Sequence, residues 1–342
     1  MKIKFFLILG ILFFIVFMVT EIIIRNLTPI INKGDDLLGW KLLPNLDLEF
    51  NQKALSKKKY TVKFLTNARG SRYYGNEQDA EIKILVIGDS ATNGPYASND
   101  SMWFSILAKD LQVKLNKKIY VEAIGSGGYG TFQQYLLLKE IEIKDILNPD
   151  FIILQFCGND FYNNSYEWES SGFTRNQYVR RPYLVNNKIY YHQGFIKYIY
   201  NSYLFENIRL INRADLLVTL LQALIANNFF DGVPGMNYAK NDATLLEFQK
   251  NSVVITDIIL SKIKKQFSNK DLFVFNACKV RGQYPFNTWM SISTKNELIP
   301  LDFYEDIKFT EESYYKDGGH LNEQGNFYVG KELSNILFNY LK

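Results

Sequence analysis

One serine in this chain stands where a buried strand should end. Residues 83–94 read KILVIGDSATNG, so a continuous apolar run stops at Gly-Asp-Ser and presents Ser90. A serine hydroxyl is a weak nucleophile unless a base takes its proton, a third group orients that base, and donors stabilise the oxyanion of the attacked carbonyl. If Ser90 does chemistry, the rest of the sequence has to supply these partners.

Histidine is the natural base near neutral pH, and the chain has two, His192 and His320. His192 lies in YYHQG with no acid nearby, which favours an ordinary role. His320 lies in KDGGHLNEQG, three residues after Asp317, and the two glycines between them let the carboxylate curl back to hold the imidazole. We expect Ser90, Asp317 and His320 to be catalytic, although Asp-x-x-His alone is equally typical of a loop before a capped helix.

Two further polar stretches follow expected strands and could supply oxyanion donors. GSGGYGT spans residues 125–131, where the lack of side chains lets a backbone N–H approach a substrate closely. FCGND spans residues 156–160 and offers the side-chain amide of Asn159. Glycine-rich loops after strands also bind phosphates, but G-x-x-x-x-G-K-[ST] is absent and the nucleotide interpretation is weak.

Sulfur-based metal chemistry is excluded by the cysteines, because Cys157 and Cys278 form neither a zinc spacing nor a C-x-x-C pair. Each ends an apolar run typical of a strand. We expect two buried free thiols, and a disulfide between them stays open if the domain lies in an oxidising compartment. We expect neither a metal nor a cofactor.

Together, the polar stretches resemble the motifs of the SGNH hydrolases, also called GDSL-like esterases and lipases. GDSATNG at 88–94 is similar to the first block of that family, GSGGYGT to the second, CGND at 157–160 to the third and DGGH at 317–320 to the last. Each block is short and common, but their order and their positions at strand ends are specific. The resemblance covers about residues 80–342, with a large insertion between the third and last blocks.

The resemblance implies a covalent acyl-serine mechanism. In it, Ser90 is the nucleophile, His320 is the base and Asp317 orients the base. It also implies an oxyanion hole made by the backbone N–H groups of Ser90 and Gly128 and by the side chain of Asn159.

Two positions depart from the family pattern. Ala123 stands where the second block usually carries Asn shortly before its glycines, which leaves Gly127 as a possible substitute for Gly128. Cys157 replaces the first glycine of the third block, a change that concerns packing more than chemistry.

The elements that must position these residues alternate along the chain. Apolar runs at 82–87, 119–125, 151–157 and 271–277 are predicted strands, and residues 103–115, 131–147, 244–267 and those after 322 are predicted helices. Strands that are apolar throughout and separated by helices are typical of a parallel sheet covered on both faces. We therefore expect a three-layer α/β/α sandwich with a central parallel sheet, the flavodoxin-like SGNH fold, with ligands bound at the carboxyl ends of the strands.

The N-terminus predicts a transmembrane helix. Lys2 and Lys4 precede an apolar run from Phe5 to Val19 that resumes at 22–24 after Thr20 and Glu21, and the whole stretch is about long enough to span the hydrocarbon. No small-x-small cleavage site follows, which favours an uncleaved signal anchor over a removed signal peptide. The lysines favour a cytoplasmic N-terminal end and an extracytoplasmic catalytic domain.

The predicted organisation has three parts: the anchor over 1–25, a connecting region with an accessory strand in TVKFLTNARGSRY over 26–80, and the hydrolase-like domain over 81–342. An insertion at about 161–240 is rich in Tyr, Asn and Phe. These aromatics either line a sugar-binding cleft or cover the core. Its apolar segment ADLLVTLLQALIA is too short for a second membrane span.

The composition is that of a globular chain, with 47% hydrophobic and 22% charged residues. The net charge of +4 falls to +2 when the first 25 residues are set aside, because they carry three basic residues and one acidic residue. No basic block is interleaved with aromatics, so we expect no nucleic-acid partner.

We expect a membrane-anchored serine ester hydrolase that removes O-acyl groups, such as acetyl, from an extracytoplasmic glycan. Two alternatives stay open. One is an O-acyltransferase that uses the same triad on a surface polysaccharide, and the other is a glycan-binding or assembly protein that keeps the fold without turnover. A lipase is less favoured, because no separate apolar lid is evident.

Overall fold

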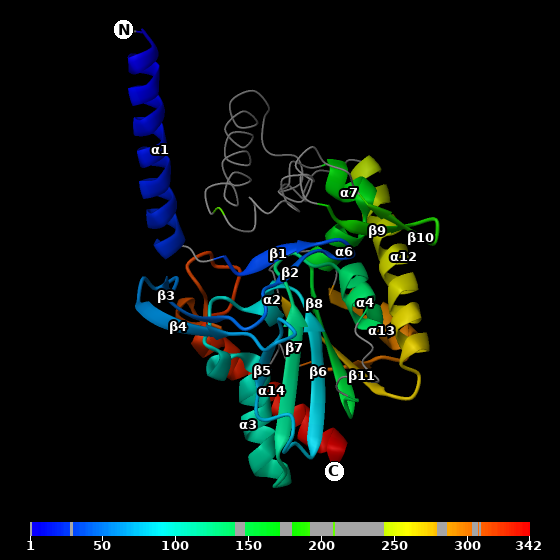
Figure 1. Ribbon diagram of the computed structural model, residues 1–342. Helices are drawn as coiled ribbons and strands as arrows, with labels where there is room; N and C mark the ends of the chain where they lie inside the picture. The colour runs from blue at the N-terminus through cyan, green and yellow to red at the C-terminus, as the bar shows by residue number, and fades with distance from the viewer. Residues whose placement is uncertain are drawn as a thin grey trace.

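A six-stranded sheet forms the centre of the protein (Figure 1). The computed structural model describes residues 2–27, 30–140, 148–171, 180–191, 208, 243–278, 286–302, 307 and 309–342. The strand order is β12-β11-β8-β6-β7-β5. The strands are β5 (Arg72–Tyr74), β6 (Ile82–Gly88), β7 (Ile119–Gly125), β8 (Phe151–Cys157), β11 (Asp271–Cys278) and β12 (Ile299–Pro300). All neighbours pair in parallel except β5, which runs antiparallel to β7 at the edge.

Helices cover both faces of this sheet. On one face lie α3 (Trp103–Leu115) and α14 (Glu323–Leu341), and on the other lie α4 (Thr131–Glu140), α12 (Ala243–Gln266) and α13 (Phe286–Lys295) (Figure 1). Every residue of β8 is buried, because its apolar side chains feed a separate core cluster on each face. The expected three-layer sandwich is confirmed, with one antiparallel edge strand added.

The connecting region forms three small pieces rather than one accessory strand. Two hairpins, β1 (Asn32–Asp35) with β2 (Gly39–Leu42) and β3 (Asp47–Lys53) with β4 (Lys59–Leu65), precede the edge strand β5. The stretch predicted as one strand is interrupted because Gly70 adopts a left-handed conformation (φ 80°) and its N–H donates to Asn67 O at 3.0 Å. Its first half therefore pairs with β3, and its second half joins the main sheet.

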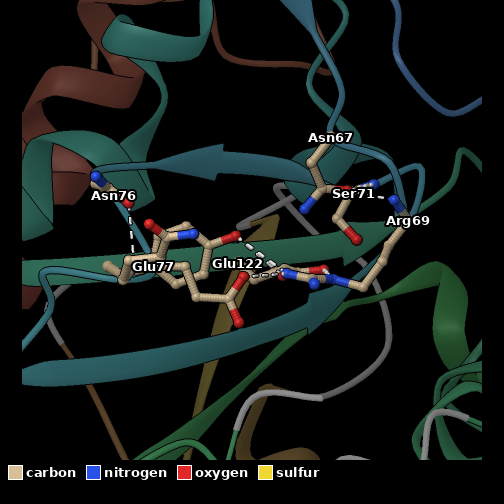
Figure 2. Close-up of polar contacts among 8 residues, drawn as sticks. Asn67, Arg69, Ser71, Asn76, Glu77 and Glu122 are labelled. Carbon is tan, nitrogen blue, oxygen red and sulfur yellow. Dashed lines mark hydrogen bonds and ion pairs between the residues drawn. The ribbon is translucent and has the colours of Figure 1, made fainter.

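A buried charge fastens this region to the sheet. Glu122 on β7 is fully buried, and its carboxylate accepts hydrogen bonds from Arg69 Nε at 2.8 and 3.0 Å. Figure 2 shows the same guanidinium beside Glu77, whose carboxylate it meets at 2.9 Å. The Asn67 side chain closes the turn by accepting from the backbone N–H groups of Arg69 and Ser71. The turn before β5 is thus anchored to a central strand.

The N-terminal helix α1 (Lys2–Leu27) projects away from the rest of the chain (Figure 1). Its segment Lys4–Arg25 is long and apolar enough to cross a membrane, with a mean hydropathy of 2.9, and 6% of it is buried against the protein. A signal sequence has the same length and composition. Near its end, Arg25 pairs with Glu21 at 2.8 Å.

Cys157 differs from the prediction. It is bonded in a disulfide rather than being a free thiol. The other cysteine of the chain, Cys278, is its register partner on the neighbouring strand β11. Adjacent parallel strands bring these positions together because both cysteines end their strands, a placement that spacing along the sequence does not reveal.

The insertion is described in part. Its described elements are α6 (Asn159–Asn164), α7 (Tyr166–Ser171), β9 (Pro182–Val185) and β10 (Lys188–Tyr191). The apolar segment at 214–226 and His192 lie outside the described residues, as does the stretch 141–147 of the predicted helix that begins as α4.

Candidate active site

The turn after β6 exposes Ser90. The four-residue helix α2 (Ser90–Asn93) begins directly after Asp89, whose carboxylate caps it by accepting from Ala91 N at 2.9 Å. A side chain at Gly88 would place its Cβ 2.2 Å from Thr92 Oγ1 and 2.3 Å from Gln155 Oε1, so only glycine fits. As the first residue of a helix, Ser90 has a backbone N–H with no intrahelical partner.

The structure brings Ser90, His320 and Asp317 together. Ser90 Oγ lies 2.9 Å from His320 Nε2, and His320 Nδ1 lies 2.6 Å from Asp317 Oδ2. The other oxygen of Asp317 accepts from the backbone N–H groups of Gly319 and His320, at 2.9 and 3.0 Å. Gly318 permits this tight loop with a left-handed φ of 69°. A hydroxyl, an imidazole and a carboxylate thus form one hydrogen-bonded line.

Electrostatics keep Asp317 charged. Partial burial raises the pKa of its carboxyl, but the hydrogen bond and the attraction of His320, together with the two backbone donors, outweigh that effect and hold the pKa below its usual value. A charged Asp317 stabilises a protonated imidazole, which is what an orienting group beside a general base must do.

The loop after β7 presents two free backbone donors beside Ser90. Within the described part of the chain, the N–H groups of Gly127 and Gly128 have no protein acceptor. A Cβ built on Gly127 would lie 3.9 Å from Ser90 Cβ, and Gly128 has a left-handed φ of 79°. The loop is closed by Tyr129 N, which donates to Ser126 O at 3.1 Å. This arrangement can accommodate an oxyanion at either glycine.

Asn159 begins α6 immediately beyond β8. Its amide nitrogen donates to Asn163 Oδ1 at 2.9 Å and faces Asp89 Oδ2 at 3.3 Å. The contact with Asp89 is the longer of the two, so a substrate oxygen that accepts from Asn159 would replace Asp89 Oδ2 rather than Asn163 Oδ1 as the acceptor. The side chain therefore lies between the capping carboxylate of the Ser90 helix and the body of α6.

Two fully buried carboxylates, Asp89 and Asp160, support these loops. Burial raises the pKa of Asp89. Burial and the charge of Asp89 together raise that of Asp160 well above its usual value. Asp160 Oδ2 accepts from Cys157 N at 2.7 Å, and its Oδ1 accepts from Thr131 and Gln134 at 3.1 and 3.0 Å. Asp160 thus ties the end of β8 to the first turn of α4.

Arg72 is a supporting residue that the sequence motifs do not reveal. Its side chain is fully buried beneath α2 and donates to the carbonyls of Asn93 and Gly94 at 2.9 and 2.7 Å. Burial lowers the pKa of this guanidinium to about 9. The cation sits at the carboxyl end of α2, where helix carbonyls lack partners. In the sequence Arg72 lies between Ser71 and Tyr73, in a stretch with no apolar run beside it, so no local pattern signals its burial.

A cavity of about 540 Å³ opens beside the triad. It is lined by Ser90 and His320 and by apolar and aromatic side chains that include Leu55, Tyr96 and Tyr314. The Tyr96 ring lies against the His320 ring, with centroids 4.5 Å apart. Among the described residues, no group of three or more His, Cys, Asp or Glu side chains is placed to hold a metal ion.

Residues 84–333 match the family of the GDSL-like Lipase/Acylhydrolase. Similar solved structures include the lipase/acylhydrolase from Enterococcus faecalis (13% identity, covering 76% of this chain and 96% of that chain, TM-score 0.41). Another is the lipase Lip_vut3 from a goat rumen metagenome (13% identity, covering 76% of this chain and 100% of that chain, TM-score 0.42). A third is a carbohydrate esterase family 2 enzyme with a carbohydrate binding domain from Corynascus thermopiles (11% identity, covering 83% of this chain and 71% of that chain, TM-score 0.41). None of the curated proteins compared with the chain matches it. On the extent of the family match, the chain belongs to the GDSL-like lipases and acylhydrolases.

Proposed function

We propose that this ester hydrolase works through an acyl-Ser90 intermediate and removes O-acyl groups from an extracytoplasmic glycan. The observation that carries the proposal is the hydrogen-bonded line of three side chains. Ser90 Oγ lies 2.9 Å from His320 Nε2, and His320 Nδ1 lies 2.6 Å from Asp317 Oδ2. No other arrangement of residues is needed to activate the hydroxyl.

In the first half of the reaction, Ser90 Oγ attacks the ester carbonyl while His320 Nε2 takes its proton. Asp317 stabilises the imidazolium, and the N–H groups of Ser90 and Gly128 with the amide of Asn159 donate to the oxyanion. Collapse of the tetrahedral intermediate breaks the bond to the alcohol oxygen. The departing alcohol takes the proton from His320 and leaves an acyl group on Ser90.

In the second half, a water molecule replaces the alcohol. His320 Nε2 takes a proton from this water as its oxygen attacks the acyl-serine, and the same donors hold the new oxyanion. The bond to Ser90 Oγ breaks, the serine oxygen recovers its proton from His320, and a carboxylic acid leaves. The cycle requires no group beyond those in the site.

The substrate class rests on two features. The N-terminal helix has the length and hydropathy of a membrane anchor, which would place the domain at a cell envelope. The cavity beside Ser90 presents the aromatic side chains of Tyr96 and Tyr314, and aromatic faces offer apolar surface with a polar edge for sugar rings. Both support an acylated glycan over a small soluble ester.

Replacement of Ser90 by alanine tests the reaction type. We expect Ser90→Ala to abolish release of p-nitrophenol from p-nitrophenyl acetate and labelling by a fluorophosphonate. Ser261→Ala, at an exposed position on α12, should leave both unchanged. Unchanged turnover in Ser90→Ala would remove Ser90 from its role. Failure of the folded wild-type protein to react with the probe would favour a binding or assembly protein.

An O-acetylated oligosaccharide tests the substrate and the acceptor. Wild-type protein should release free acetate from it, measured by mass spectrometry, and Ser90→Ala should not. Acetate that appears on an added acceptor sugar instead of in solution would make the protein an O-acyltransferase with the same nucleophile. Turnover of the nitrophenyl ester without any loss of acetyl from the oligosaccharide would overturn the glycan assignment alone.

A further inference from the structure

The hairpin that follows the N-terminal helix contacts the proposed oxyanion loop directly. Trp40 on β2 is buried, and its indole Nε1 donates to Gly127 O at 3.2 Å. In a trans peptide, the carbonyl of one residue and the N–H of the next point in opposite directions. The structure has no cis peptide among its described residues, so the donor that holds Gly127 O also fixes the direction of the Gly128 N–H.

Arg181 holds the next peptide of the same loop. Its side chain is fully buried, its Nη2 donates to Gly128 O at 2.6 Å, and its Nη1 donates to Gln133 Oε1 at 2.7 Å. The guanidinium also lies over the Trp40 ring, 4.9 Å from its centroid. Gly128 therefore sits between two peptide planes, one fixed by Trp40 and the other by Arg181.

Glu169 on α7 connects Arg181 to the second proposed donor. Its buried carboxylate lies 3.2 Å from Arg181 Nε, and its other oxygen accepts from Asn163 Nδ2 at 3.3 Å. Asn163 Oδ1 in turn accepts from the amide of Asn159 at 2.9 Å. One buried ion pair thus bears on both the Gly128 loop and Asn159, although these follow different strands of the sheet.

Burying the charges of Arg181 and Glu169 costs desolvation free energy, so we ask whether the network fixes the geometry of the Gly128 loop. A buried ion pair is weak evidence for stability, because removing both charges from water offsets much of their attraction. A glycine loop, however, has few side-chain contacts of its own to define it. Oxyanion donors must point correctly before the reaction begins, and a displacement of about 1 Å can cost about 100-fold in rate.

We propose that Trp40, Arg181 and Glu169 are positioning residues of the oxyanion hole. Trp40 and Arg181 set the direction of the Gly128 N–H, and Glu169 couples this loop to Asn159. The inference rests on the proposed acyl-serine reaction and deepens it. It makes the hairpin after the N-terminal helix, which lies before the segment that matches the family, a part of the catalytic apparatus.

The test separates loss of the indole N–H from loss of packing. Trp40→Phe keeps a ring under Arg181 but removes the donor to Gly127 O. With p-nitrophenyl acetate, we expect kcat to fall by about tenfold or more while KM and the melting temperature stay close to those of the wild type. Trp289→Phe is the matched control: this tryptophan is buried in the core and its indole N–H has no partner in the described part of the structure. It should keep kcat within about twofold.

Arg181 provides a second comparison that does not depend on Trp40. Arg181→Met removes the donor and the charge, whereas Arg181→Lys keeps a cation beside Glu169 and one donor for Gly128 O. We expect kcat in the order wild type, Lys, Met, with part of the loss rescued by lysine. Wild-type kcat in Trp40→Phe and in Arg181→Met would overturn the inference, as would loss of kcat that follows the melting temperature in every variant, the Trp289 control included.

Failure of the positioning role can be told apart from failure of the proposed acyl-serine reaction. If Ser90→Ala keeps wild-type turnover, the nucleophile assignment fails whatever Trp40 does. If Ser90→Ala is inactive and Trp40→Phe is fully active, the acyl-serine reaction stands and the positioning role fails.

Discussion

His320 Nε2 and Ser90 Oγ meet at 2.9 Å although the two residues are 230 positions apart in the sequence. The contact joins the turn after the first central strand to the loop that precedes the last helix. That loop is held by Tyr315 N, which donates to His320 O at 2.8 Å, and by Asn322, which caps α14 through Gln324 N and Gly325 N. His320 is therefore held by a backbone hydrogen bond on one side and by the side-chain cap of Asn322 on the other.

Asp317→Asn should lower kcat for p-nitrophenyl acetate by about 10³-fold to 10⁴-fold. The amide keeps the shape of the carboxylate but cannot stabilise the imidazolium, and it can hold the wrong tautomer of His320. Steady-state kinetics measure the effect. Asp100→Asn, at an exposed carboxylate near Lys109, is the control and should be indistinguishable from the wild type. Activity above one tenth of wild type in Asp317→Asn would contradict the role of the carboxylate.

Asp110 should make stability depend on acid. Burial raises the pKa of its carboxyl, but the hydrogen bonds of Lys114 and Lys331 outweigh burial and lower the pKa to about 2. A group whose pKa is lower in the folded state contributes stability above its unfolded pKa of about 3.8 and loses it as the pH falls through the folded value. Compared with Asp110→Asn, the wild type should therefore lose unfolding free energy as the pH falls from 6 to 2, by about 1 kcal/mol once solvent screening of this partly exposed pair is counted.

Urea unfolding of both proteins across this pH range measures that difference. The Lys331 contact links α14 to α3, so the effect reports on the helix that follows the His320 loop. A difference between the two proteins that does not change with pH would show that Asp110 is not held charged by these lysines.

Gly88→Ala should destabilise the protein by about 1–3 kcal/mol. The added methyl would lie 2.2 Å from Thr92 Oγ1 and 2.3 Å from Gln155 Oε1, contacts too short to persist, so the Ser90 turn or the Gln155 side chain on β8 must move. Denaturant unfolding measures the loss, and kcat should fall with it. Gly10→Ala, where an added carbon meets nothing within 4 Å, should cause no destabilisation. An unchanged unfolding midpoint in Gly88→Ala would contradict the close packing of this turn.

Leu55→Trp should change substrate selection by filling the cavity beside Ser90. If the acyl group enters the cavity, kcat/KM for p-nitrophenyl hexanoate should fall at least tenfold more than that for p-nitrophenyl acetate, because a larger side chain removes space that only the longer chain needs. The ratio of the two specificity constants measures this. A ratio equal to that of the wild type would assign the cavity to the alcohol part of the ester instead.

The sequence predicts the central elements closely because their patterns are strong. The strands expected at 82–87, 119–125 and 151–157 lie at β6, β7 and β8, and their continuous apolar runs reflect burial on both faces. Ser90, Asp317 and His320 could be chosen because only one of two histidines has a nearby acid. The glycine loop is less specific, because Ala123 departs from the family pattern and leaves Gly127 as an alternative to Gly128.

What the sequence does not reveal depends on contacts between distant segments. Trp40 is 87 positions from Gly127, and Arg181 is 53 positions from Gly128, and neither belongs to a motif with its partner. The disulfide at Cys157 depends on which strands are neighbours, which is decided by the order of the sheet rather than by the spacing of cysteines. The break of the accessory strand at Gly70 depends on a left-handed turn that alternation of apolar residues conceals.

The place of Trp40 and Arg72 determines where the chain can be shortened. Both lie before residue 84, where the match to the family begins, and they contact the loop at Gly127 and the end of the Ser90 helix. Truncation to the family-matched segment would remove the Trp40 hydrogen-bond donor from the Gly127 loop and the buried Arg72 cation from the end of the Ser90 helix. The smallest unit that keeps both contacts therefore starts at the first hairpin, near residue 30, so the segment between α1 and β6 belongs to the same folded unit as the loops around Ser90.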